Sequence, residues 1–156
     1  MHRISPCLWF DNQAEQAANF YLSIFPNSKI NTITRYSAAG PGPEGSVMVV
    51  SFELDGVEFV ALNGGPVFQF NEAVSLAISC QTQAEVDHYW DKLTAGGTQG
   101  QCGWLKDKYG VSWQVVPIEL TEMMARPDAA RVKRMTQAMM KMKKLEIATL
   151  RSAFNA

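Results

Sequence analysis

The sequence predicts an α+β fold made of two β-α-β-β-β modules followed by C-terminal helices. Three observations predict it. A short strand followed by a helix cap occurs twice, so that Tyr21 aligns with Trp90 at an offset of about 70 residues. In each copy, β-rich segments ending in a hairpin follow the helix. After Pro117 the apolar residues recur at helical spacing. A chain of 156 residues suits one well-buried domain, which is what we expect.

We expect the first module to span residues 3–63 approximately. Its first strand, ISPCLWF, leads into a helix whose start is indicated by a capping box of Asn12 and Glu15. An Asp55-Gly56 pair is a strong hairpin turn signal and joins the last two strands of the module. The three strands that follow the helix are expected to be KINTITRY, VMVVSFEL and VEFVALN.

We expect a linker at residues 64–73 and, after it, a second module that spans residues 74–117 approximately. VSLAISC predicts its first strand, and Thr82 with Glu85 forms a second capping box. The stretch GWLKDKYGVSWQVV predicts a terminal hairpin that turns at Gly110. The second module therefore repeats the first with shorter connections.

Residues 118–156 are expected to be helical, with Pro127 at a first helical position. From Arg126 to Arg151, eight Lys or Arg face two acidic residues, which gives +6 and leaves −7 for the rest of the chain. Because these charges lie between apolar residues at helical spacing, we interpret them as the solvated face of a helix rather than a surface that binds nucleic acid. The apolar stripe, interpreted as core or dimer interface, comprises Val132, Met135, Ala138, Met139 and Met142.

Composition excludes several classes of protein. No apolar run approaches the roughly 20 residues that span a bilayer, and the N-terminal segment does not resemble a secretory signal, so we expect a cytoplasmic protein with no membrane contact. Cys7, Cys80 and Cys102 are odd in number and far apart, which argues against a disulfide framework or a CxxC metal site.

Five motifs together cover nearly the whole chain: PCLWFDNQAEQAANFY, LNGGPVFQF, QAEVDHYWDKL, CGWLKDKYGVSWQVVP and RVKRMTQAMMKMKKLEIATL. Through these motifs the chain resembles the PhnB-like branch of the vicinal oxygen chelate superfamily, which includes glyoxalase I, bleomycin resistance proteins and extradiol dioxygenases. The resemblance implies that each module curls into half a cup, that paired modules enclose a cavity, and that the protein is a homodimer. Relatives often carry the label 3-demethylubiquinone-9 3-methyltransferase, which the sequence does not support because it has no glycine-rich strand-to-helix turn.

Enzymes of the superfamily hold a divalent metal with a His from the first strand and a Glu from the last strand of each module. Counting along this sequence puts the first-strand positions at Pro6 and Ser75. The last-strand positions fall at Val60 or Ala61, and at Gln114. These residues are not the expected ligands, so we predict no metal centre of this type and no cofactor.

Other catalytic candidates are weak, and no catalytic residue is assigned. His2 lies near the N-terminus. His88 lies off the apolar stripe of its helix, and we therefore interpret it as a surface residue. Cys102 has no nearby histidine to activate its thiol. Asp107 would need to face the cavity to act as a general acid.

What remains is a cavity suited to hydrogen bonding with a neutral or mildly polar ligand. Strand alternation puts Ser112 and Gln114 on one face of the last strand. Phe68, Phe70 and Trp104 are candidate walls, although ordinary core packing explains each aromatic equally well. The candidate ligand-binding residues are Ser75, Gln114, Asn63, Phe68, Phe70, Trp104 and Cys102.

The leading hypothesis is a metal-free protein that binds a small organic ligand in the cup. The alternative is an enzyme of the same superfamily that acts on a small oxygen-bearing substrate with an atypical metal site or Cys102. A third hypothesis is a regulatory interaction module that works through the basic C-terminal helices.

Overall fold

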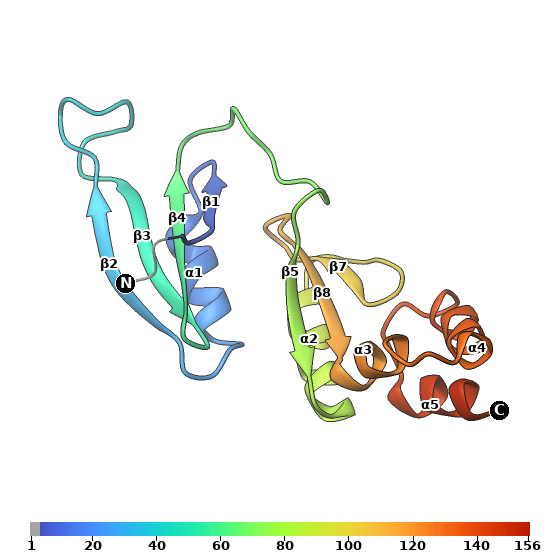
Figure 1. Cartoon of the computed structure of the whole chain (residues 1–156). Helices are drawn as coiled ribbons and strands as arrows, with labels where there is room; N and C mark the ends of the chain where they lie inside the picture. Colours follow the sequence, from blue (N-terminus) through green and yellow to red (C-terminus); the bar gives the residue numbers. More distant parts are fainter. Residues whose placement is uncertain (1–3) are drawn as a thin grey trace. The chain divides into compact units, whose positions relative to one another are not determined.

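The computed structural model describes residues 4–156, so His2 lies outside the described part of the chain. Contacts divide the chain into two compact units, one ending at Phe70 and one from Asn71 to Ala156. Each contains a four-stranded mixed sheet with one helix against one face (Figure 1). The α+β fold with two β-α-β-β-β modules is therefore confirmed.

The first unit has the strand order β1-β4-β3-β2. β1 and β4 run parallel, and the other neighbouring strands run antiparallel. The Asp55-Gly56 hairpin turn joins β3 to β4 as predicted, with both residues in the left-handed region. The elements are β1 (Cys7–Phe10), α1 (Ala14–Leu22), β2 (Lys29–Arg35), β3 (Val47–Leu54) and β4 (Val57–Asn63).

Strand alternation divides this sheet into a face that packs on α1 and a face without a helix. The small residues Ala17 and Ala18 of α1 are fully buried and allow the helix to approach the sheet closely. The buried sheet residues on this side are Leu8, Phe10, Val50, Phe52, Leu54, Phe59 and Ala61. Tyr21 stacks near Phe52 with ring centroids 6.5 Å apart.

The predicted capping box of α1 is wrong. Gln13, not Asn12, is the N-cap residue, and it makes no side-chain cap hydrogen bond. Instead, the Ala14 N–H donates to Asn63 Oδ1 at 2.8 Å. Because Phe10 and Asn63 are partners in the parallel β1–β4 pair, Asn63 lies next to the start of the helix. A cap that comes from another strand leaves no local pattern in the sequence.

The second unit repeats the topology with the strand order β5-β8-β7-β6. The second capping box is confirmed, because Thr82 Oγ1 accepts from the Glu85 N–H at 3.2 Å and Glu85 Oε2 accepts from the Gln81 N–H at 2.6 Å. The elements are β5 (Leu76–Cys80), α2 (Gln83–Thr94), β6 (Thr98–Gln99), β7 (Trp104–Lys106) and β8 (Ser112–Pro117).

Three C-terminal helices complete this unit: α3 (Ile118–Met124), α4 (Ala129–Met139) and α5 (Ile147–Asn155). The methionine stripe of α4 belongs to a core with Met135 fully buried and Val132, Met139 and Met142 packed against it. Pro127 does not start α4, because Asp128 is the N-cap and accepts from the Arg131 N–H at 3.1 Å. The other buried members of this core are Leu120, Met123, Leu145, Leu150 and Phe154.

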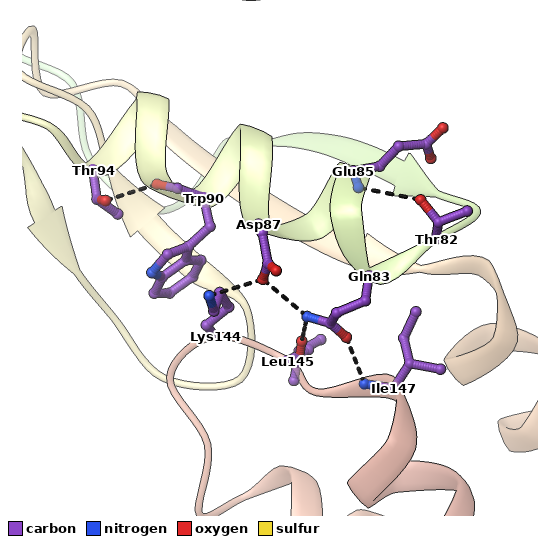
Figure 2. A network of polar contacts seen from close by, with 9 residues as sticks. All are labelled: Thr82, Gln83, Glu85, Asp87, Trp90, Thr94, Lys144, Leu145 and Ile147. Carbon is purple, nitrogen blue, oxygen red and sulfur yellow. Dashed lines mark hydrogen bonds and ion pairs between the residues drawn. The ribbon is translucent and has the colours of Figure 1, made fainter.

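The segment before α5 is docked on α2 by polar contacts (Figure 2). Lys144 Nζ lies 2.8 Å from Asp87 Oδ1, and both pKa values shift in favour of the ion pair, chiefly through this hydrogen bond. Gln83 donates to the Leu145 carbonyl at 3.1 Å and accepts from the Ile147 N–H at 2.8 Å. Several basic residues of this region thus have acidic or carbonyl partners within their own unit.

No helix among residues 4–156 is long and apolar enough to cross a membrane.

Candidate ligand-binding face of the second module

The sheet of the second unit has a face opposite to α2, which we call the helix-free face. It is defined by Ala77, Trp104, Lys106, Ser112 and Gln114. The register places Ala77, Gln114 and Trp104 in one row across three strands, and Lys106 opposite Ser112 in the next. Partners in register project from the same side of a sheet. The alternate residues Leu105, Trp113 and Val115 are buried on the α2 side.

Ser75 and Gln114 are brought together on this face. Gln114 Nε2 donates to Ser75 Oγ at 2.9 Å, and both residues are half-buried. Ser75 immediately precedes β5, one row from the Ala77–Gln114 pair. Gln114 Oε1 has no hydrogen-bond partner among the described residues, so this acceptor is left for a ligand or water.

Asp107 does not face a cavity and instead holds the terminal hairpin. It is 3% exposed, and its Oδ1 accepts from the N–H groups of Tyr109 at 2.8 Å and Val111 at 3.1 Å. Its Oδ2 accepts from Trp113 Nε1 at 2.8 Å. This carboxylate therefore fixes the register of β7 and β8, and with it the positions of Trp104 and Gln114.

A small cavity of about 280 Å³ lies at the edge of the helix-free face. Glu72 and Lys106 form an ion pair at 2.5 Å, and the hydrogen bond from Lys106 lowers the pKa of the Glu72 carboxyl. Ser112 is 1% exposed, and its Oγ has no hydrogen-bond partner among the described residues. Sequence reasoning missed Glu72 and Lys106, because no local pattern in the linker or on the short β7 marks them as partners. The cavity is lined by Glu72, Thr98, Gln99, Gly100, Trp104, Leu105, Lys106 and Ser112.

The predicted ligand-binding residues of the first unit, Asn63, Phe68 and Phe70, have surroundings different from those of Gln114. The Asn63 amide is engaged at both ends, accepting from the Ala14 N–H and donating to the Val47 carbonyl at 3.1 Å. Phe68 is 63% exposed and packs edge-on against Trp9, with ring centroids 5.0 Å apart. Phe70 packs in the same way against Phe10, at 5.1 Å.

Trp9 is an aromatic residue of the first unit that sequence reasoning did not single out. Its Nε1 donates to the Gly65 carbonyl at 2.9 Å. A Cβ on Gly64 would lie only 2.2 Å from the indole ring, so the backbone of this linker lies directly against Trp9. A cavity of about 420 Å³ in this unit lies elsewhere, between the start of α1 and the loop that contains Pro41, Gly42 and Pro43.

Cys102 points away from Gln114 and toward the C-terminal segment. Its Sγ lies 3.6 Å from the Met139 carbonyl oxygen and 3.7 Å from Met140 Sδ. Cys80 is buried, and burial raises the pKa of its thiol to about 12.

The strand register shows which residues of the first and last strands are partners near the predicted metal positions. Cys7, not Pro6, is the partner of Val60 on the helix-free side of the first sheet, and Ala61 is buried on the α1 side. In the second sheet the corresponding partners are Ala77 and Gln114.

These four positions do not fit a divalent ion of the superfamily type. Valine and alanine have no donor atom, and partial burial raises the pKa of the Cys7 thiol, which disfavours the thiolate that metals bind. His88 is exposed on α2, against Tyr89. Within residues 4–156, no group of three or more His, Cys, Asp or Glu is arranged to hold a metal ion.

Comparison with known proteins agrees with this architecture. Residues 2–116 match the family model described as 3-demethylubiquinone-9 3-methyltransferase. The chain belongs to this family. A PhnB protein from Bacillus cereus that carries the same methyltransferase description is 39% identical, with a TM-score of 0.68, and the match covers 74% of this chain and 99% of that chain. The PhnB-like resemblance is thereby confirmed.

More distant structures share the PhnB-like fold. A protein from Pseudomonas aeruginosa is 17% identical with a TM-score of 0.62, over 75% of this chain and 98% of that chain. The fosfomycin resistance protein FosX from Listeria monocytogenes, in complex with Mn(II) and sulfate, is 15% identical with a TM-score of 0.52, over 74% of this chain and 89% of that chain. A search of curated proteins finds no match.

Proposed function

We propose that this PhnB-like protein binds a small organic molecule on the helix-free face of its second module, without the metal centre of the superfamily. The observation that carries the proposal is the hydrogen bond between Gln114 and Ser75. A neutral amide occupies the last-strand position at which enzymes of the superfamily carry a Glu ligand. An amide and a hydroxyl bind polar ligands through donors and acceptors, and they are not among the Cys, His and carboxylate groups that typically hold zinc.

The surroundings of this pair favour binding over catalysis. Trp104 lies in the same row as Gln114 and offers an aromatic surface, and the half-buried pair is partly shielded from water. Among the described residues of this face, no nucleophile is paired with a base, because Cys102 is directed at Met139 and Asp107 is committed to its hairpin. An enzyme that uses Cys102 is therefore the less supported alternative.

The methyltransferase description is not part of the proposal. The two strand-to-helix turns of the described chain, at residues 11–13 and 81–82, contain no glycine. A nucleotide-like cofactor needs such glycines for close approach of the backbone to its phosphates or carboxylate. The proposal includes no cofactor, nucleic acid or membrane partner. The superfamily resemblance implies a homodimer, and a cytoplasmic location remains the expectation from the sequence.

Metal analysis of the purified protein tests the first half of the proposal. We expect well under one divalent ion per chain and no change in thermal stability on addition of EDTA. One tightly bound divalent ion per chain, with a loss of stability or activity on chelation, would contradict a metal-free site.

Binding of neutral fragments tests the second half. In ¹⁵N NMR, fragments that carry an amide and an aromatic ring are expected to shift the Gln114 side-chain amide and the Ser75 backbone amide. Gln114→Ala should weaken this binding about tenfold, the effect of one or two hydrogen bonds at a half-buried site. Gln137→Ala, an exposed glutamine on α4, is the matched control and should leave binding unchanged.

A further inference from the structure

Ser112 carries a buried hydroxyl that the fold leaves unsatisfied. Its Oγ has no partner in the described chain, although the residue is 1% exposed and lines the 280 Å³ cavity. Buried polar groups in native proteins are nearly always hydrogen-bonded, because an unmade bond has a substantial energetic cost. The hydroxyl faces away from α2, on the same side of β8 as Gln114.

Lys106 brings a positive charge to the same place. It is opposite Ser112 in the β7–β8 register, so the two side chains start from neighbouring positions on one face. Its ammonium has three donors, and the structure gives it one ionic partner, the Glu72 carboxylate. The cavity therefore presents hydroxyl and ammonium donors side by side, next to the Trp104 ring.

Glu72 shows that a carboxylate fits against Lys106. It comes from a turn before β5, its side chain is 61% exposed, and the ion pair is open to solvent. Such exposed ion pairs contribute little to stability, because water and salt screen them. An incoming carboxylate can thus replace Glu72 at small cost and can also accept a hydrogen bond from Ser112, which Glu72 does not do in this structure.

We propose that this cavity takes the carboxylate of a small organic acid, held by Ser112 and Lys106 after displacement of Glu72. At about 280 Å³ the cavity accommodates a compact acid or one end of a longer ligand. The rest of the ligand then extends past Trp104 toward Gln114 and Ser75, which lie in the next row of the sheet. This inference rests on the proposed function, because it assigns a chemical class to the ligand of the same face.

Benzoate and benzamide form a matched pair of probes, with the same ring and with or without the negative charge. We expect benzoate to shift the backbone amides of Ser112 and Lys106 in ¹⁵N NMR of the full chain, and to bind at least tenfold more tightly than benzamide. Ser112→Ala should weaken benzoate binding about tenfold or more, as expected for a hydrogen bond to a charged group. Glu72→Gln should tighten it a few-fold, because the competing carboxylate is gone.

Two controls separate binding from folding. Ser152→Ala, an exposed serine on α5, should change neither affinity nor stability. Ser112→Ala should keep or slightly raise the thermal midpoint, because the hydroxyl has no internal partner to lose. A fall of several degrees in the midpoint of Ser112→Ala would show that the hydroxyl is satisfied within the fold and would overturn the inference.

The remaining outcomes distinguish this inference from the proposed function. Equal affinities for benzoate and benzamide, or benzoate binding unaffected by Ser112→Ala, would overturn the carboxylate site. If benzamide alone shifted the signals of Gln114 and Ser75, the proposed function would stand without it. If neither the two probes nor the neutral fragments shifted any residue of the face, both proposals would fail.

Discussion

At the scale of single residues, a side-chain amide stabilises the fold in the first module, whereas a side-chain amide in the second module is available to bind a ligand. Asn63 ends β4, and its amide is used by the fold, as the cap of α1 and as a donor to Val47. Gln114 lies on the last strand of the second module. Within the described chain, the Ser75 hydroxyl is the only hydrogen-bond partner of its side-chain amide. An amide that retains a free acceptor is the better candidate to contact a ligand.

Asn63→Ala tests this division of roles. The substitution removes a helix cap and a second hydrogen bond, so we expect the free energy of unfolding to fall by about 1–3 kcal/mol in urea denaturation. Asn12→Ala is the matched control, since Asn12 is exposed and makes no cap, and it should change stability by less than about 0.5 kcal/mol. Equal losses in the two variants would mean that Asn12 caps α1 after all.

At the scale of elements, the loop before β7 is held by the C-terminal segment. The N–H groups of Cys102 and Gly103 donate to the carbonyls of Met142 and Lys143, each at 2.8 Å. Gly103 has a φ of +84°, and a Cβ there would lie 2.8 Å from the Val115 carbonyl oxygen and 3.0 Å from Leu145. A glycine is thus required where three segments of backbone meet. This junction sets the position of Trp104, the next residue along the chain.

Gly103→Ala should be strongly destabilising for that reason. Backbone strain and steric overlap together predict a loss of about 2–4 kcal/mol in the free energy of unfolding. Gly110→Ala provides the control, because its φ of +87° imposes a similar strain with no atom within 4 Å of the added Cβ. We expect the control to lose only about 1 kcal/mol. Comparable losses, measured by chemical denaturation, would argue against close packing at Gly103.

At the scale of the whole molecule, the C-terminal helices are an integral part of the second unit. The family match ends at residue 116, yet Leu145 is 1% exposed and belongs to a core with Met135 and Leu150. The same segment is tied to α2 through Gln83 and Asp87 (Figure 2). This packing supports a structural role for the helices over an interaction module with a free basic surface.

Deletion of residues 118–156 should therefore disturb the second unit selectively. Hydrogen exchange is expected to speed up at the amides of α2 and β7, which lose their apolar and polar partners. Amides of β3 and β4 should keep their protection, because the core of the first unit comes from residues up to Phe70. Uniformly unchanged exchange in both units, with loss of binding to a partner protein, would favour the interaction-module hypothesis instead.

The sequence alone determined the element types, the two-module repeat, the Thr82 cap and the methionine core, because these follow from periodicity and short-range hydrogen bonds. It also placed Gln114 at the last-strand position, by counting from the hairpin turn. Contacts between segments far apart in the chain, by contrast, emerged only from the folded structure. Asn63 caps a helix 49 residues away, and Lys106 pairs with Glu72 from the linker. The face of the sheet on which Cys7 lies likewise depended on the strand register, because a shift of one residue moves every side chain of a strand to the opposite face.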